Sequence, residues 1–103
     1  MNFITPEKFT GDKAWDALPI AEIEGASVKL HWTDQPYIWH ANDGDEVFVV
    51  LEGEVTMKYK RGGKTFEENL TPGMICHAET GDEHVAHPIG VARVLVIEKI
   101  GSV

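Results

Sequence analysis

Short apolar segments separated by turn residues dominate the chain from Ile20 onward. Val, Ile, Thr and aromatic residues gather in these segments, and Gly, Pro, Asp or Asn interrupts them about every 8–12 residues, as in all-β proteins. Polar and apolar residues alternate in 26–32 and 55–59, which predicts strands with one buried face. The same signals predict further strands at residues 37–40, 47–51, 64–70, 74–78, 84–87 and 91–97. The chain is therefore predicted to be all-β.

The N-terminal segment lacks this pattern. Phe9, Trp15 and Leu18 are its apolar anchors, and Thr5 could cap a helical turn that begins at Pro6. Gly11 weakens a helix, so a loop with a short turn is the alternative. We expect a short N-terminal turn or helix before the strands.

The number of predicted strands indicates how they are arranged. About eight short strands in about 100 residues favour a double-sheet roll or a small barrel, because closure removes exposed strand edges. Adjacent glycines within residues 61–64 predict a tight hairpin turn between two of these strands. An immunoglobulin-type sandwich is the alternative architecture. We expect one domain over residues 1–103, with a core barrel over about residues 20–100.

Composition and charge exclude several function classes. The single cysteine permits no internal disulfide, which is typical of a cytoplasmic protein, and the N-terminus lacks the pattern of a signal peptide. The longest apolar run, residues 47–51, is far shorter than the ~20 residues of a membrane helix, so no membrane contact is expected. A net charge of −8 opposes binding to phosphate backbones, so no nucleic-acid partner is expected.

Histidines and one carboxylate supply the candidate chemistry. His40 and Asn42 are two residues apart, so their side chains leave a strand on the same face. Glu46 stands at the start of an apolar strand, where a carboxylate is costly unless something compensates its charge. A metal ion would do so. A histidine taken alone in a β protein is more often structural than a ligand, and the grouping is what favours a site.

A second segment, residues 73–84, adds a glycine at each of two turns and His84 just beyond the second. Together the two stretches resemble the motifs of the cupins, G-x5-H-x-H-x3/4-E-x6-G and G-x5-P-x-G-x2-H-x3-N. The corresponding residues of this chain are His40-x-Asn42-x3-Glu46-x6-Gly53 and Gly73-x5-Glu79-x-Gly81-x2-His84-x3-Pro88. Every spacing is kept and six of the ten motif residues are present; the departures are Asp34, Asn42, Glu79 and Pro88.

The cupin resemblance implies a double-stranded β-helix, a jelly-roll barrel, with a metal ion held by side chains that project inside. Carried over by position, the ligands are His40, Glu46 and His84, with Asn42 where the family has another histidine. An Asn oxygen is a weaker, neutral ligand than imidazole, and two His with one carboxylate suit Fe(II), with Mn, Ni or Zn as alternatives. A barrel that has lost its metal is the other interpretation.

A ligand pocket is expected inside the barrel, beside the metal. The residues that we expect to line it are Trp39, Phe48, Tyr59, Cys76 and His77. Cys76 and His77 are neighbours on a strand, so one should face inside; the simpler interpretation makes Cys76 a small buried group and His77 a rim residue. Acidic residues near the mouth would disfavour anionic ligands, unless Arg93 points inward.

Three functions follow from these expectations. The first is a metal-dependent oxygenase or isomerase acting on a small molecule. The second is a non-catalytic module that binds a small molecule, and the third is a barrel that serves only as a scaffold. In each case we expect a homodimer, because the apolar row of Val47, Val49 and Leu51 on the outer face needs covering.

Overall fold

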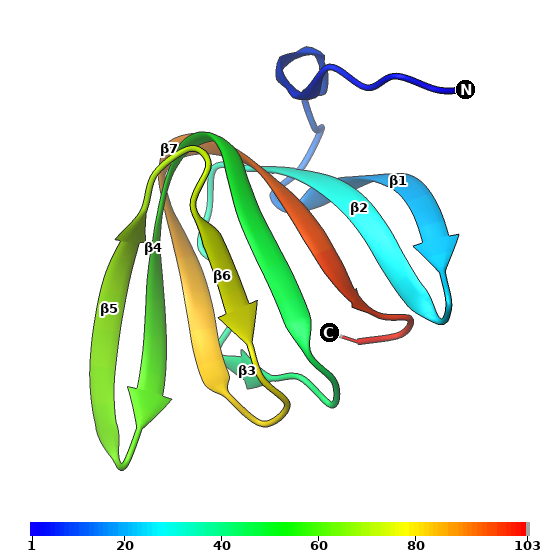
Figure 1. Cartoon of the computed structure of the whole chain (residues 1–103). Helices are drawn as coiled ribbons and strands as arrows, with labels where there is room; N and C mark the ends of the chain where they lie inside the picture. Colours follow the sequence, from blue (N-terminus) through cyan, green and yellow to red (C-terminus); the bar gives the residue numbers. More distant parts are fainter. Residues whose placement is uncertain (103) are drawn as a thin grey trace.

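The computed structural model describes residues 1–102, and strands account for most of them (Figure 1). Its elements are η1 (Pro6–Lys8), β1 (Asp16–Ile23), β2 (Ala26–Thr33), β3 (His40–Ala41), β4 (Glu46–Arg61), β5 (Lys64–Leu70), β6 (Ile75–Ala78) and β7 (Glu83–Lys99). The strands hydrogen-bond in the order β1-β2-β7-β4-β5, while β3 pairs with β7 and β6 pairs with β4. All pairs are antiparallel. The all-β prediction is confirmed.

Two long strands, β4 and β7, form the centre of the fold. Each joins two segments that the sequence predicted as separate strands, 47–51 with 55–59 in β4 and 84–87 with 91–97 in β7. Their pairing shifts register between Val50 and Glu52 and again between Glu52 and Glu54. Such bulges bend a strand without ending it. Figure 1 shows both strands curving. One half of β7 pairs with β2 and the other with β3, whereas one half of β4 pairs with β6 and the other with β5.

Gly53 lies at this bend, where the backbone of β4 passes close to that of β7 at Val91. Its φ is +81°, and a Cβ atom there would lie 2.3 Å from the carbonyl oxygen of Val91. A residue with a side chain would meet both a strained backbone conformation and a backbone clash. Glycine is therefore needed for β4 and β7 to bend together.

The buried core lies between the two halves of the bent sheet. Alternate residues of β4 and β7 point into it, as the period of two requires. The buried core residues are Phe48, Val50, Val55, Met57, Leu70, Ala86, Ala92, Val94 and Val96. Glu46 and Glu98 continue the inward faces of β4 and β7 at one end, where the apolar core stops and polar residues begin.

The N-terminal segment lies over Arg93 on the outside of the sheet through its residues 9 and 10, whereas its Trp15 packs against the core. Its predicted helical turn is short, covering only Pro6–Lys8, and Thr5 makes no side-chain capping bond. Arg93 is buried beneath it and donates hydrogen bonds to the carbonyl oxygen of Phe9 (2.8 Å) and to Glu52 Oε1 (2.6 Å). Arg93 therefore faces away from the barrel interior and does not balance the acidic residues there. No helix within residues 1–102 is long and apolar enough to cross a membrane.

Candidate metal centre

Three strands bring His40, Glu46 and His84 to one point inside the barrel. His40 of β3 is the register partner of His84 on β7, and Glu46 is the first residue of β4. One potential ligand atom from each side chain lies within 4.8 Å of the others. His84 Nε2 is 3.0 Å from Glu46 Oε1, and the two imidazole rings are 4.5 Å apart between centroids. Residues that the motif spacing predicted as ligands are thus clustered.

Backbone carbonyls orient both imidazole rings. His40 Nδ1 donates to the carbonyl oxygen of Ile38 at 2.8 Å, and His84 Nδ1 donates to that of Asp82 at 2.9 Å. A carbonyl oxygen can only accept, so Nδ1 carries the hydrogen in each ring. Histidines that ligate metals usually hold their other ring nitrogen in this way. Both Nε2 atoms are therefore the ones available for an ion.

Charge in the cluster is arranged around Glu46, which is buried. Burial alone would raise the pKa of Glu46, but hydrogen bonds with His84 and Glu98 outweigh it and hold that pKa below its usual value. The hydrogen bond to Glu46 raises the pKa of His84, although burial opposes this. A proton on His84 Nε2 thus compensates the carboxylate, and a divalent cation could replace that proton.

Asn42 occupies the position where the cupin motif has a further histidine. It is only 4% exposed, and neither Oδ1 nor Nδ2 has a hydrogen-bond partner among the described residues. Its backbone oxygen accepts from Gly81 N, which fixes the loop but leaves the side chain unsatisfied. A buried amide without partners costs about 1–3 kcal/mol, which coordination through Oδ1 would offset. The residues present therefore fit a divalent ion.

A cavity of about 130 Å³ adjoins the cluster. The three candidate ligands form part of its wall, and Phe48 lines it as predicted. The rest of the wall consists of Trp15, His31, Tyr37, Met57, Ala86, Val96 and Glu98. Of these seven, sequence reasoning counted only Tyr37 among the aromatic residues available for the pocket. The others were missed because strand pairing between distant segments brings them there. The period-two alternation that places Glu98 on the face of Val96 was the one available signal.

Glu98 is the second carboxylate of this wall. It is the register partner of Glu46 across β4 and β7, so both side chains point to the same side of the sheet. Burial, together with the hydrogen bond and the charge of Glu46, raises the pKa of Glu98 to about 7. Its Oε2 atom is buried and has no hydrogen-bond partner among the described residues.

The other residues expected to line the pocket lie elsewhere. Tyr59, Cys76 and His77 line a second cavity of about 180 Å³, which shares Met57 and His84 with the first. Cys76 is opposite Phe48 and half-buried, and burial raises the pKa of its thiol, so it is not an activated nucleophile.

The structure corrects the expectation that Trp39 lines the pocket. Its side chain borders neither cavity and is 43% exposed, with Lys60 Nζ 4.9 Å above the ring. The physical reason is alternation: His40, the next residue, points inward, so Trp39 points out.

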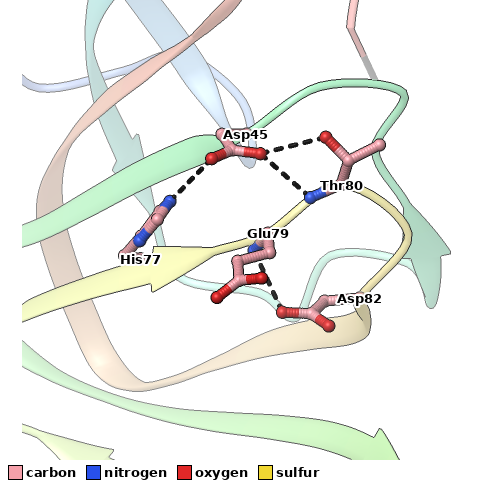
Figure 2. Close-up of polar contacts among 5 residues, drawn as sticks. All are labelled: Asp45, His77, Glu79, Thr80 and Asp82. Atoms are coloured by element: carbon pink, nitrogen blue, oxygen red, sulfur yellow. Dashed lines mark hydrogen bonds and ion pairs between the residues drawn. The ribbon is translucent and has the colours of Figure 1, made fainter.

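His77 belongs to an exposed polar cluster with Asp45 and Thr80 (Figure 2). Its Nε2 lies 2.9 Å from Asp45 Oδ2, while Asp45 Oδ1 accepts hydrogen bonds from Thr80 N (3.1 Å) and Thr80 Oγ1 (2.9 Å). Asp82 Oδ2 accepts from the backbone N–H of Glu79 at 3.0 Å. These bonds fix the turn between β6 and β7, which carries the Asp82 carbonyl that orients His84.

Known structures share this architecture. No protein-family model and no curated sequence matches the chain. Among solved structures, a cupin-2 domain containing protein from Shewanella frigidimarina is 26% identical over 86% of this chain and 84% of its own, with a TM-score of 0.76. A cupin superfamily protein from Desulfitobacterium hafniense is 15% identical over 97% of this chain and 93% of its own, also with a TM-score of 0.76. This chain has the fold of a small single-domain cupin.

A larger enzyme with a similar fold contains a metal ion. Hydroquinone 1,2-dioxygenase PnpCD, in complex with Cd²⁺ and 4-hydroxybenzonitrile, is 17% identical over 87% of this cupin and 67% of its own chain, with a TM-score of 0.73. At this identity the likeness concerns the fold alone. The double-stranded β-helix predicted from the motifs is confirmed.

Proposed function

We propose that this cupin binds one divalent metal ion through His40, Glu46 and His84 and a small organic molecule in the adjoining cavity. The observation that carries the proposal is the convergence of three ligand atoms from three strands, all within 4.8 Å of one another. In both imidazoles Nδ1 donates a hydrogen bond to a carbonyl oxygen, as in most histidines that ligate metals. This bond fixes the ring and leaves Nε2 to coordinate the ion. We propose a metal-dependent oxygenase or isomerase.

The donor set indicates the kind of ion. Two imidazoles with one carboxylate suit Fe(II), with Mn, Ni and Zn as alternatives, and Asn42 Oδ1 would add a neutral oxygen. When bound, such an ion supplies a Lewis acid or a redox centre. The chain itself holds the ligands by β-pairing, excludes water with aromatic walls, and releases the His84 proton when an ion binds.

A non-catalytic binding cupin is the second candidate function. The observation that favours it is the contact between His84 Nε2 and Glu46 Oε1, 3.0 Å apart and almost completely buried. This pair satisfies its own charges without an ion, so the barrel can fold and hold an organic ligand in the metal-free state. We retain the expectations of a homodimer and a cytoplasmic location under both functions.

Titration calorimetry with Mn²⁺ and Zn²⁺ tests the ligand assignment. We expect His84→Ala to weaken binding by roughly a hundredfold or more, because it removes a donor that the fold positions. His87→Ala is the matched control, since His87 lies on the same strand but borders neither cavity. Unchanged affinity in His84→Ala, with circular dichroism showing a folded protein, would mean that the ligand set is wrong.

A further inference from the structure

The second cavity, of about 180 Å³, has Arg61 in its wall. Tyr59 is the register partner of His84 across β4 and β7, so its side chain lies next to a candidate metal ligand on the same face of the sheet. Arg61 follows two residues later in β4 and takes the same face, roughly 6.5 Å further along the strand. The wall of this cavity therefore leads from the candidate metal centre to an arginine.

The guanidinium of Arg61 has no charged partner in the protein. It forms no ion pair within residues 1–102. Its Cζ atom lies 5.9 Å from the centroid of the Tyr59 ring, and that ring stacks on Phe66 with 5.7 Å between centroids. A guanidinium that packs against an aromatic ring keeps the N–H groups at its edge for another partner. Arg61 is therefore held beside the cavity with donors that a ligand can use.

The charges around the two cavities indicate which ligand fits. Among the described residues, Arg61 is the one lysine or arginine that lines either cavity. A guanidinium recognises a carboxylate through two parallel hydrogen bonds. Asp82 is the carboxylate of the same wall, and its Oδ2 accepts from the backbone N–H of Glu79 at 3.0 Å. Because the charge of Asp82 opposes further negative charge, a monoanion fits this cavity better than a dianion.

We propose that the second cavity holds the carboxylate of a small organic acid, which Arg61 binds through two hydrogen bonds. The remainder of the molecule reaches past Met57 and His84, which line both cavities, toward the first one. Arg61 thus takes the role that the sequence offered to Arg93, which faces outward. The inference rests on the proposed function, because it names the ligand class of the site beside the metal.

A matched set of probes tests this selectivity. Benzoate, benzyl alcohol and benzylamine have nearly the same shape and differ in charge. Calorimetry on protein with and without Mn²⁺ should show, in both states, that benzoate binds at least about tenfold more tightly than benzyl alcohol. Benzylamine should bind no more tightly than the alcohol.

Two variants of one hairpin test where the carboxylate binds. Arg61→Gln removes the guanidinium, so benzoate should bind at least about tenfold more weakly, whereas the affinity for benzyl alcohol should change less than about twofold. Lys64→Gln is the matched control, since Lys64 is the register partner of Arg61, carries the same charge and lines neither cavity. It should change benzoate binding less than about twofold.

Three results would overturn the proposal. One is binding of benzoate by the wild-type protein that is no tighter than that of benzyl alcohol. Another is a loss of benzoate binding in Lys64→Gln as large as in Arg61→Gln, which would assign the effect to the general charge of the hairpin. The third is benzoate binding that needs Mn²⁺ and is unchanged in Arg61→Gln, which would place the carboxylate on the metal ion.

The same titrations separate this inference from the proposed function. A benzoate preference that depends on Arg61, in a protein that binds no metal ion, would support the inference and contradict the proposed metal site alone. Mn²⁺ binding without a benzoate preference would contradict only the inference.

Discussion

Asn42 is the residue at which this chain departs most consequentially from the cupin motif. The spacing predicted that its side chain leaves the chain on the same face as His40, and the structure buries both of its polar side-chain atoms without partners among the described residues. An amide oxygen is a weaker ligand than an imidazole nitrogen for Fe(II), Ni²⁺ or Zn²⁺. We therefore expect the substitution to make metal binding at the proposed site weaker than with a full set of family ligands.

Asn42→His should strengthen metal binding. An imidazole at this position would add a stronger donor to His40, Glu46 and His84, and we expect roughly a tenfold gain in affinity for Zn²⁺. Competition titration against a chelator of known affinity measures the change, with wild-type protein as the reference. Weaker binding in the variant would show that residue 42 does not face the ion.

His31 should make stability depend on pH. Burial, with a smaller contribution from the charge of Lys29, lowers the pKa of His31 below 6.5, while Trp15 and nearby carboxylates oppose the shift. The unfolded chain then takes up a proton at this ring more readily than the folded one. The contribution of His31 to the free energy of unfolding must therefore fall as the pH drops below about 6.5.

Urea denaturation of metal-free protein at about pH 7.5 and about pH 5.5 measures this dependence. Glu98 and His84 have raised pKa values and favour the folded state at the lower pH, so the test is the difference between two proteins. On going to the lower pH, His31→Gln should lose less stability, or gain more, than the wild type, because its residue 31 does not titrate. An identical change in both proteins would contradict the assignment of a neutral, buried imidazole.

At the scale of elements, the continuity of β4 and β7 is what could not be predicted from the sequence. The apolar segments and their alternation were predicted, and so was the hairpin between β4 and β5. Gly53 was recognised as a motif glycine but interpreted as an interruption between strands. A turn and a bulge carry the same local signal, and only the approach of Val91 in the folded protein distinguishes them.

Gly53→Ala should destabilise the fold strongly. The new Cβ atom would clash with the Val91 carbonyl and the backbone would be held at a positive φ, so we expect a loss of at least about 2 kcal/mol in the free energy of unfolding. Gly62→Ala is the control: its φ is +58°, but a Cβ atom there meets nothing within 4 Å. That variant should lose only about 1 kcal/mol. Equal losses in urea denaturation would contradict the close approach at the bend.

The candidate site was predictable only where its residues lie in the two motifs. His40, Glu46 and His84 could be named because their spacing is kept, and Phe48 because it alternates with Glu46. The opposite wall comes from β2, the end of β7 and the segments that carry Trp15 and Tyr37. Alternation indicates which face a residue takes but not which end of the barrel it reaches, so these contacts need the strand register.

For the whole molecule, the acidity of the chain has two components. Most acidic residues are exposed and account for the net charge of −8, whereas Glu46 and Glu98 lie on the inner face next to the core. Because Arg93 points outward, no arginine of the described residues balances the inner pair. The inner pair of carboxylates is therefore placed where it would balance the charge of a divalent ion at the histidines.

Metal content is the measurement that tests the central claim most directly. Protein purified without chelators, or stripped and reloaded with Fe(II), Mn²⁺ or Zn²⁺ in turn, should carry about one ion per chain after dialysis, as determined by inductively coupled plasma mass spectrometry. His84→Ala treated in the same way should carry almost none. A folded wild-type protein that retains none of these ions would contradict the account.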